Sequence, residues 1–134
     1  MIDILNPLIT RIGDELRKDR PGLYVTGELS ENTRSRFPCV LVEEIDNSDT
    51  ETDNSGVSPQ AFLQYRITVF SNKQSGRISE AREIMSAVDD VMQSINFRKR
   101  SFLGQSGLYN NSVYQIETTY SAAADAEGVI YLRK

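Results

Sequence analysis

The chain has 134 residues, enough for a single domain with its own hydrophobic core over residues 1–134. Its formal net charge of -4 argues against a protein that coats nucleic acid by charge alone. It has no histidine and one cysteine, Cys39, which excludes an internal disulfide and every Ser-His or Cys-His catalytic pair and indicates a reducing compartment.

The first predicted element is an amphipathic helix that begins near Asp3 and is ended by Pro21 and Gly22. Its apolar residues recur at three- and four-residue steps: Leu5, Leu8, Ile9, Ile12 and Leu16. Asp3 or Asn6 is expected to cap the helix. Acids and a proline interrupt the apolar run, so we expect neither a signal peptide nor a membrane span, and a protein made in the cytoplasm.

Two strands are predicted next, a short one over residues 23–29 and a second over residues 37–45. Pro38 cannot donate a backbone hydrogen bond, so it belongs at the start of the second strand or on an edge. The run from Cys39 to Val42 is apolar on both faces. We therefore expect this part of the strand to be covered on both sides.

A third strand is predicted over residues 61–71, where apolar and polar residues alternate except for Phe62 and Phe70 on the polar face. The stretch before it, residues 46–59, is almost wholly polar and is expected to be a long loop. The second and third strands are therefore expected to pair as antiparallel neighbours.

The clearest predicted helix covers residues 77–95, with Ser75 as its expected cap. Its expected packing face consists of Ile78, Ala81, Met85, Val88, Met92 and Ile95. Two more strands are predicted over residues 96–104 and 112–122, with a turn at Gly104–Gly107 between them. A turn near residues 124–128 and a short last strand over residues 129–134 complete the chain.

This order predicts an α+β fold, a mainly antiparallel β-sheet with two amphipathic helices packed on one face. Phe62 and Phe70, with Tyr114 and Tyr120 or their neighbours, are expected to leave the second face partly apolar. A sheet face with exposed aromatic residues usually indicates a binding partner.

Six acids and no basic residue lie between Glu43 and Gly56: Glu43, Glu44, Asp46, Asp49, Glu51 and Asp53. A calcium loop that starts at Glu51 has its glycine in phase but places Phe62 where the closing glutamate is required. A nuclease site of the acid, then acid-x-Lys type lacks the lysine. The stretch is therefore interpreted as a solvated surface loop, and no metal, cofactor or catalytic residue is expected.

The one basic cluster consists of Arg98, Lys99 and Arg100, next to Phe97. Adjacent cations beside an aromatic residue can contact nucleic acid. They also protect a strand edge from aggregation, or meet acids on a neighbouring subunit. The last two interpretations are favoured equally, and Asp46, Asp49, Glu51 and Asp53 with the three cations form the candidate assembly surface.

The layout resembles the phage tail terminator, or tail-completion, proteins of long-tailed phages. The resemblance rests on the N-terminal helix, the proline-led strand "FPCVLVEE", the strand ending "ITVFS" and the helix "SEAREIMSAVDDVM" directly after it. The tail "SVYQIETTYSAAADAEGVIYLRK" is similar to the family's last hairpin. The match covers nearly the whole chain, and the acidic stretch departs from the family in length.

The resemblance implies a structural protein of the virion that forms a ring, typically a hexamer, at the tail–neck junction. Such a ring caps the tail tube, ends its polymerisation and offers a surface to the head connector or neck protein. DNA would pass through its lumen without sequence-specific binding. An acidic loop facing that lumen would repel the phosphates of the passing DNA.

Other classes of protein are also consistent with this sequence. Another neck component, such as a head-completion or connector-joining protein, would show the same lack of catalytic residues. A metal-binding module or metal-dependent nuclease would use the acidic stretch, with carboxylates as its only ligands. An adaptor that docks peptides on an open sheet edge is a further alternative.

Overall fold

The computed structural model describes residues 4–28, 37–49, 60–110 and 113–125 of the chain. Within these ranges lie two helices and five strands. In chain order they are α1 (Leu5–Arg17), β1 (Tyr24–Thr26), β2 (Cys39–Asp49), β3 (Gln60–Ser71), α2 (Arg77–Ser94), β4 (Arg98–Asn110) and β5 (Val113–Asp125). The predicted α+β class is confirmed.

The strands form one sheet in the order β1-β2-β3-β5-β4. Three of its four strand pairs are antiparallel, including the predicted pairing of β2 with β3. The exception is β1, which runs parallel to β2 with Tyr24 opposite Cys39. Consecutive strands were expected to favour antiparallel pairing, but a parallel return needs a connection of about a dozen residues, which residues 27–38 supply.

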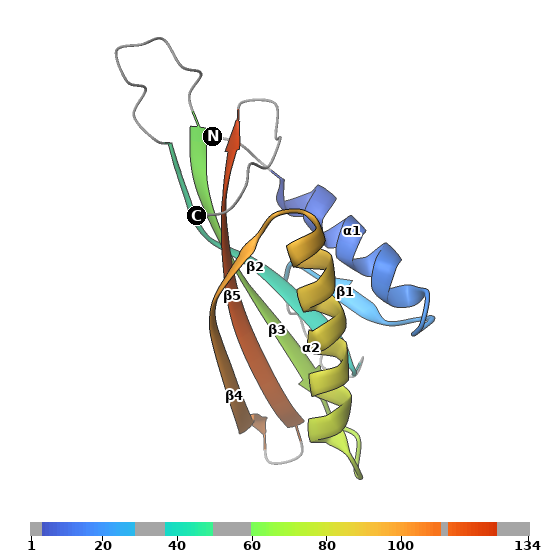
Figure 1. The fold of residues 1–134 in the computed structure, drawn as a ribbon. Coiled ribbons are helices and arrows are strands. Elements are labelled where there is room, and N and C mark those ends of the chain that lie inside the picture. Colours follow the sequence, from blue (N-terminus) through green and yellow to red (C-terminus); the bar gives the residue numbers. More distant parts are fainter. Residues whose placement is uncertain (1–3, 29–36, 50–59, 111–112, 126–134) are drawn as a thin grey trace, which may run out of the picture.

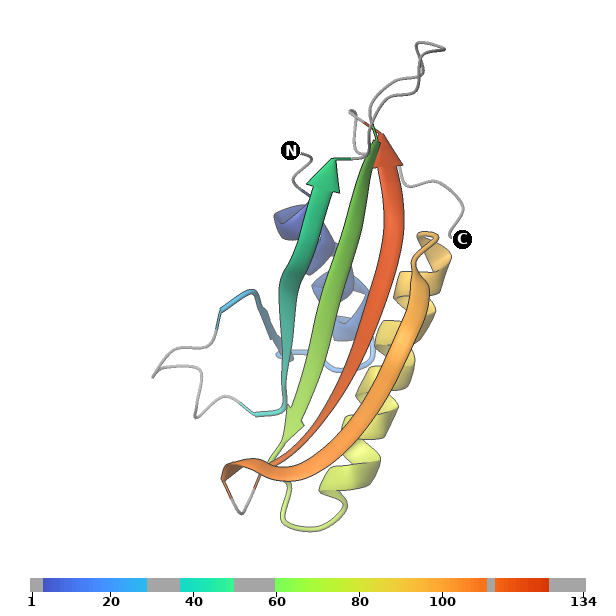
Figure 2. The same ribbon diagram turned by 90° about the vertical axis from the view of Figure 1, so that its left-hand side faces the viewer.

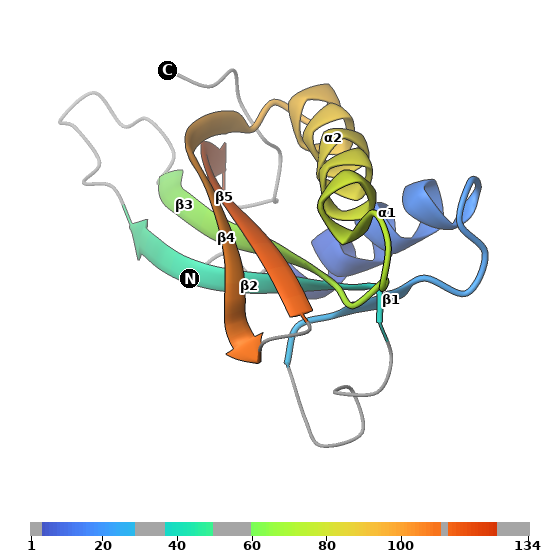
Figure 3. The same ribbon diagram turned by 90° about the horizontal axis from the view of Figure 1, so that it is seen from below.

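Both helices lie on the same side of the sheet, as predicted (Figure 1), and the view along the strands shows them side by side on that face (Figure 3). Neither described helix is long and apolar enough to cross a membrane. The helices therefore cover one face of the sheet, while no described helix lies over the opposite face (Figure 2).

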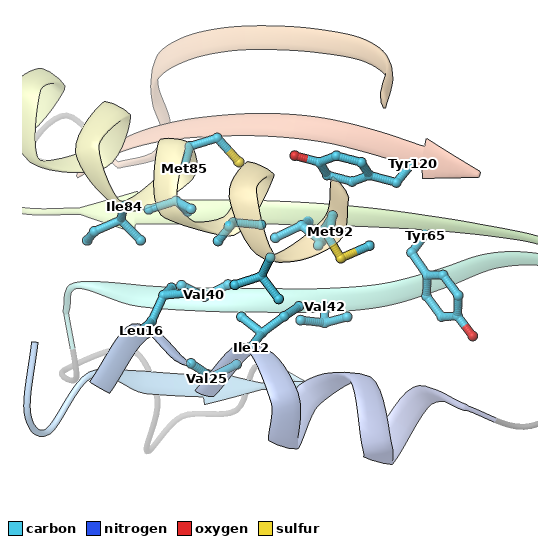
Figure 4. Close-up of a cluster of buried hydrophobic side chains, with 14 of the residues drawn as sticks. Ile12, Leu16, Val25, Val40, Val42, Tyr65, Ile84, Met85, Met92 and Tyr120 are labelled. Atoms are coloured by element: carbon cyan, nitrogen blue, oxygen red, sulfur yellow. The ribbon is translucent and has the colours of Figure 1, made fainter. Parts of the chain in front are cut away.

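The main core fills the space between the helices and the sheet (Figure 4). Ile12 of α1 and Met92 of α2 are fully buried against Val42 of β2. Tyr65 and Tyr120 are also buried here, on the face that the helices cover. Tyr114 and Tyr120 therefore do not contribute to the second face, because strand alternation places both on the helix side. Phe70 does lie on the second face, so that face is partly apolar as expected.

A smaller core lies on the opposite face of the sheet. It consists of Cys39, Leu41, Phe70 and Val113, with Tyr24 and Phe37 packed against it. The ring centroids of Phe37 and Phe70 are 6.2 Å apart. The start of β2 is thus covered on both sides, as its continuous apolar run predicted.

Several predicted boundaries differ from the structure. Helix α1 begins after Ile4 and α2 after Gly76, and neither position carries a side-chain cap, so the caps expected from Asn6 and Ser75 are wrong. Strand β4 continues through the predicted turn at Gly104–Gly107, because its backbone stays paired with β5 as far as Ser106. Asp3 and the predicted last strand over residues 129–134 lie outside the described residues.

The predicted packing face of α2 is confirmed in its middle, where Ala81, Met85, Val88 and Met92 are buried. Ile78 is 50% exposed, whereas Ile84 and Val91 are buried. This exposure places Ile78, in the first turn of α2, outside the packed face. It also makes Ile78 a natural control for the buried Ile12.

We predict that Ile12→Ala lowers the free energy of unfolding by about 2–5 kcal/mol, because Ile12 is 0% exposed and its removal leaves a cavity. The control Ile78→Ala, on an exposed helix position, should change it by less than about 0.5 kcal/mol. Urea unfolding followed by circular dichroism measures both. Equal effects of the two substitutions would contradict this core.

Candidate functional site

The structure does not place the candidate acids in one loop and the three candidate cations in one patch. Asp46 and Asp49 belong to β2, which continues to Asp49 instead of ending near residue 45. The prediction of a loop is wrong for residues 46–49, because backbone pairing with β3 continues there, with Asp46 opposite Gln64. Residues 50–59 lie outside the described residues. A pleated ladder does not require apolar side chains on a face that is open to solvent. Glu51 and Asp53 lie outside the described residues, so the lumen hypothesis for them stays a prediction.

The acidic part of β2 contains a bulge at Ile45, between Glu44 and Asp46. The extra residue leaves the Ile45 side chain 41% exposed, an unusual position for a large apolar residue in this chain. A bulge bends its strand and increases the local twist. It separates Glu44, on the helix side, from Asp46, whose partner Gln64 lies on the open face.

Glu44 is bound within the subunit. The hydroxyl of Tyr65 donates a hydrogen bond to Oε1 of Glu44 at 2.8 Å, and Nδ2 of Asn47 donates to the same oxygen at 3.1 Å. Tyr65 itself is 0% exposed and packs edge-on against Phe97. This contact fixes the middle of β2 to the core, so Glu44 serves the fold.

On the open face, Glu43 pairs with Arg66 of the neighbouring strand, with Nε of Arg66 donating to Oε1 of Glu43 at 3.1 Å. That hydrogen bond is the main reason that the pKa of Arg66 is raised, and Glu117 on β5 adds attraction. Both partners are partly exposed, so the pair contributes little stability. The open face is therefore a polar surface in this region.

The three cations of the basic cluster point to different places. Nζ of Lys99 lies 3.4 Å from Oδ1 of Asp89 on α2, so it lies on the helix side. Arg100 occupies a bulge, and its Nε donates to the hydroxyl of Ser121 at 2.6 Å. Arg98 is exposed and lies directly opposite Ser121 in β5.

The aromatic residue beside this cluster is not available to a ligand. Phe97 is 0% exposed, with its ring centroid 5.8 Å from that of Tyr65. Stacking of a base on Phe97 is thereby excluded, which weakens the nucleic-acid interpretation of the cluster. The edge-protection and subunit-contact interpretations both remain.

Asp89, like Glu44, accepts a hydrogen bond from a buried tyrosine. The Tyr120 hydroxyl donates to Oδ1 of Asp89 at 2.9 Å, and Nε2 of Gln93 donates to its other oxygen at 2.8 Å. Burial, together with this hydrogen bond, raises the pKa of Tyr120 far above its usual value. Tyr120 therefore stays protonated and acts as a fixed donor that ties α2 to the sheet.

A cleft of about 470 Å³ lies where the end of α1 meets β1 and the start of β2. Tyr24 and Phe37 contribute aromatic walls, and Arg20 and Glu80 line its charged side. Arg20 is bound to Glu83 at 2.9 Å, with Glu80 at 4.0 Å, so these charges join the turn after α1 to α2. No group of three acid or cysteine side chains among the described residues is placed to hold a metal ion.

Sequence reasoning missed two features of this surface. It did not foresee that Glu43 and Arg66 would pair, although both lie on the polar faces of strands predicted to be neighbours. It also did not foresee the bulges at Ile45 and Arg100, for which the sequence gives no signal beyond an interrupted alternation.

No protein-family model matches the sequence, and no curated protein matches it. Among solved structures, a chain of the virion of a native gene transfer agent particle is similar over 86% of this chain and 92% of its own length. The sequence identity is 10% and the TM-score is 0.43. A likeness this distant supports no assignment of function.

We predict that the Cys39 thiol reacts slowly with a thiol reagent in the native protein. Burial raises its pKa from 9.0 to about 11, so the native thiolate fraction at pH 8 is about 100-fold below that of the unfolded chain. The native labelling rate should keep rising with pH up to about 11, whereas the rate in urea should level off near pH 9. Equal rates in native and unfolded protein at pH 8 would contradict this placement.

Proposed function

We propose that this protein is a structural component of a phage virion and, more specifically, a tail terminator. In this role it forms a ring, most simply a hexamer, at the junction of tail and neck. The ring caps the tail tube, ends its polymerisation and offers a joining surface to the head connector or neck protein. The protein would be made in the cytoplasm of the bacterial host.

The proposal is supported by the order of elements and by one structural observation. The order is that of the resemblance, with the proline-led strand β2, the strand β3 ending at Ser71, and α2 directly after it. The observation that carries it is the one-sided sheet. The helices cover one face, while a second face without a described helix and the two sides of the sheet are left for contacts with other chains.

A ring needs heterologous contacts, in which one surface of each copy meets a different surface of the next. A sheet with a different strand on each side provides two such surfaces. Ring assembly requires no catalytic residue or cofactor, and we propose that the protein is not an enzyme. In the described residues, Glu43, Glu44 and Asp89 are already engaged in contacts within the subunit.

Electron microscopy of tail tubes assembled with and without this protein tests the proposal. With the protein, we expect tubes of uniform length that carry a ring at one end. Without it, tubes should continue to grow and vary in length. Addition of the major tail-tube protein alone, at the same concentration, is the control for tube growth.

Two other outcomes would overturn the proposal. A protein that binds the head connector but never the tube end would be another neck component. Calorimetric heat on titration with calcium, magnesium or manganese, abolished by Asp46→Asn, would instead favour a metal-binding module. The terminator proposal expects no such heat, because its function depends on protein contacts alone.

A further inference from the structure

The two sides of the sheet carry opposite charge. On one side, β1 pairs with β2 only from Cys39 to Leu41, and the rest of β2 has no described strand on that side. That free edge contains Glu43, Glu44 and Asp46. On the other side, β4 pairs only with β5 among the described strands. Its free edge begins with three cations, Arg98 to Arg100.

The strand register places these charges at the same height of the sheet. Asp46 lies opposite Gln64, Gln64 opposite Ser121, and Ser121 opposite Arg98. One continuous row of the sheet thus has an acid at its β2 end and a base at its β4 end. With a spacing of about 4.8 Å per strand, the two ends are roughly 14 Å apart, too far to pair within one copy.

We infer that the free edge of β4 in one copy pairs with the free edge of β2 in a second copy of this chain, with Arg98 facing Asp46. The inference rests on the ring proposed above and names its subunit contact. If neighbouring copies are related by a rotation about an axis parallel to the strands, each strand keeps its direction, and the row of Asp46 and Arg98 keeps its position along that axis. Because β2 and β4 run in opposite directions in the sheet, the pairing between copies is antiparallel.

The side chains at this contact fit the inference. Arg98 is exposed, and the structure gives it no ion pair with a described carboxylate. The Asp46 carboxylate accepts only a short hydrogen bond, 2.7 Å from the Ser48 hydroxyl, among its described contacts. Ile45, 41% exposed on the same edge, would be covered by the aliphatic stem of a neighbouring arginine.

A competing explanation is that the bulges and cations only protect the edges from unspecific pairing. The two explanations differ in what a charge reversal does. If the edges pair, Arg98→Glu places a glutamate against Asp46, and Asp46→Arg places two arginines together. If the cations only protect, neither change affects ring formation.

The test uses the full chain and two reversal variants, Asp46→Arg and Arg98→Glu, and scores rings by mass photometry and on tail-tube ends by electron microscopy. Each variant alone should lose rings by about tenfold or more at low salt. A one-to-one mixture should restore them, because an alternating ring contains only opposite-charge contacts. Lys73→Glu, an equal charge change at an exposed loop position away from both edges, should leave rings intact.

The outcomes separate the two proposals. Rings of wild-type protein that persist in both reversal variants would overturn the edge pairing and leave the terminator role standing. Loss in both variants without rescue on mixing would also overturn the Asp46–Arg98 contact, provided that circular dichroism shows both variants folded. Wild-type protein that forms no ring in solution or on tubes would overturn the function and the contact together.

Discussion

The two helices bury one face of the sheet. This one-sided burial determines which residues lie on the second face and at the two free edges. Ile12 and Met92 pack on Val42 of β2, so strand alternation sends Leu41 and Glu43 to the other face, up to the bulge at Ile45. A shift of register by one residue would invert both faces. The open face and the two free edges are therefore consequences of the core, positioned as firmly as the core itself.

Two buried tyrosines link the core to the charged edges of the sheet by hydrogen bonds. Tyr65 and Tyr120 are neighbours in one row of the sheet, and each donates its hydroxyl to an acid. Through Glu44, Tyr65 holds the middle of β2, where Ile45 bulges outward. Through Asp89, Tyr120 holds α2 and, with it, the Lys99 ammonium at the start of β4. The proposed pairing of strand edges needs such anchoring, because it requires each copy to present the same geometry to the next.

The sequence predicted the elements well where hydrophobic periodicity was strong. The α2 helix, β3 and the antiparallel β2–β3 pair follow from spacing alone. The sequence did not predict the strand order, the parallel pairing of β1 or the bulges, because these features depend on contacts between distant segments. For the candidate surface, composition identified Asp46 and Arg98, but only the register shows that they end the same row of the sheet.

Backbone hydrogen exchange of the free and the assembled protein tests the proposed edge pairing, because that pairing gives unpaired edge amides new hydrogen-bond partners. We expect slower exchange on assembly in β2 beyond Val42 and in β4, with β3 and β5 unchanged because both are already paired on two sides. Slower exchange confined to α1 and α2, with both edges unchanged, would contradict it.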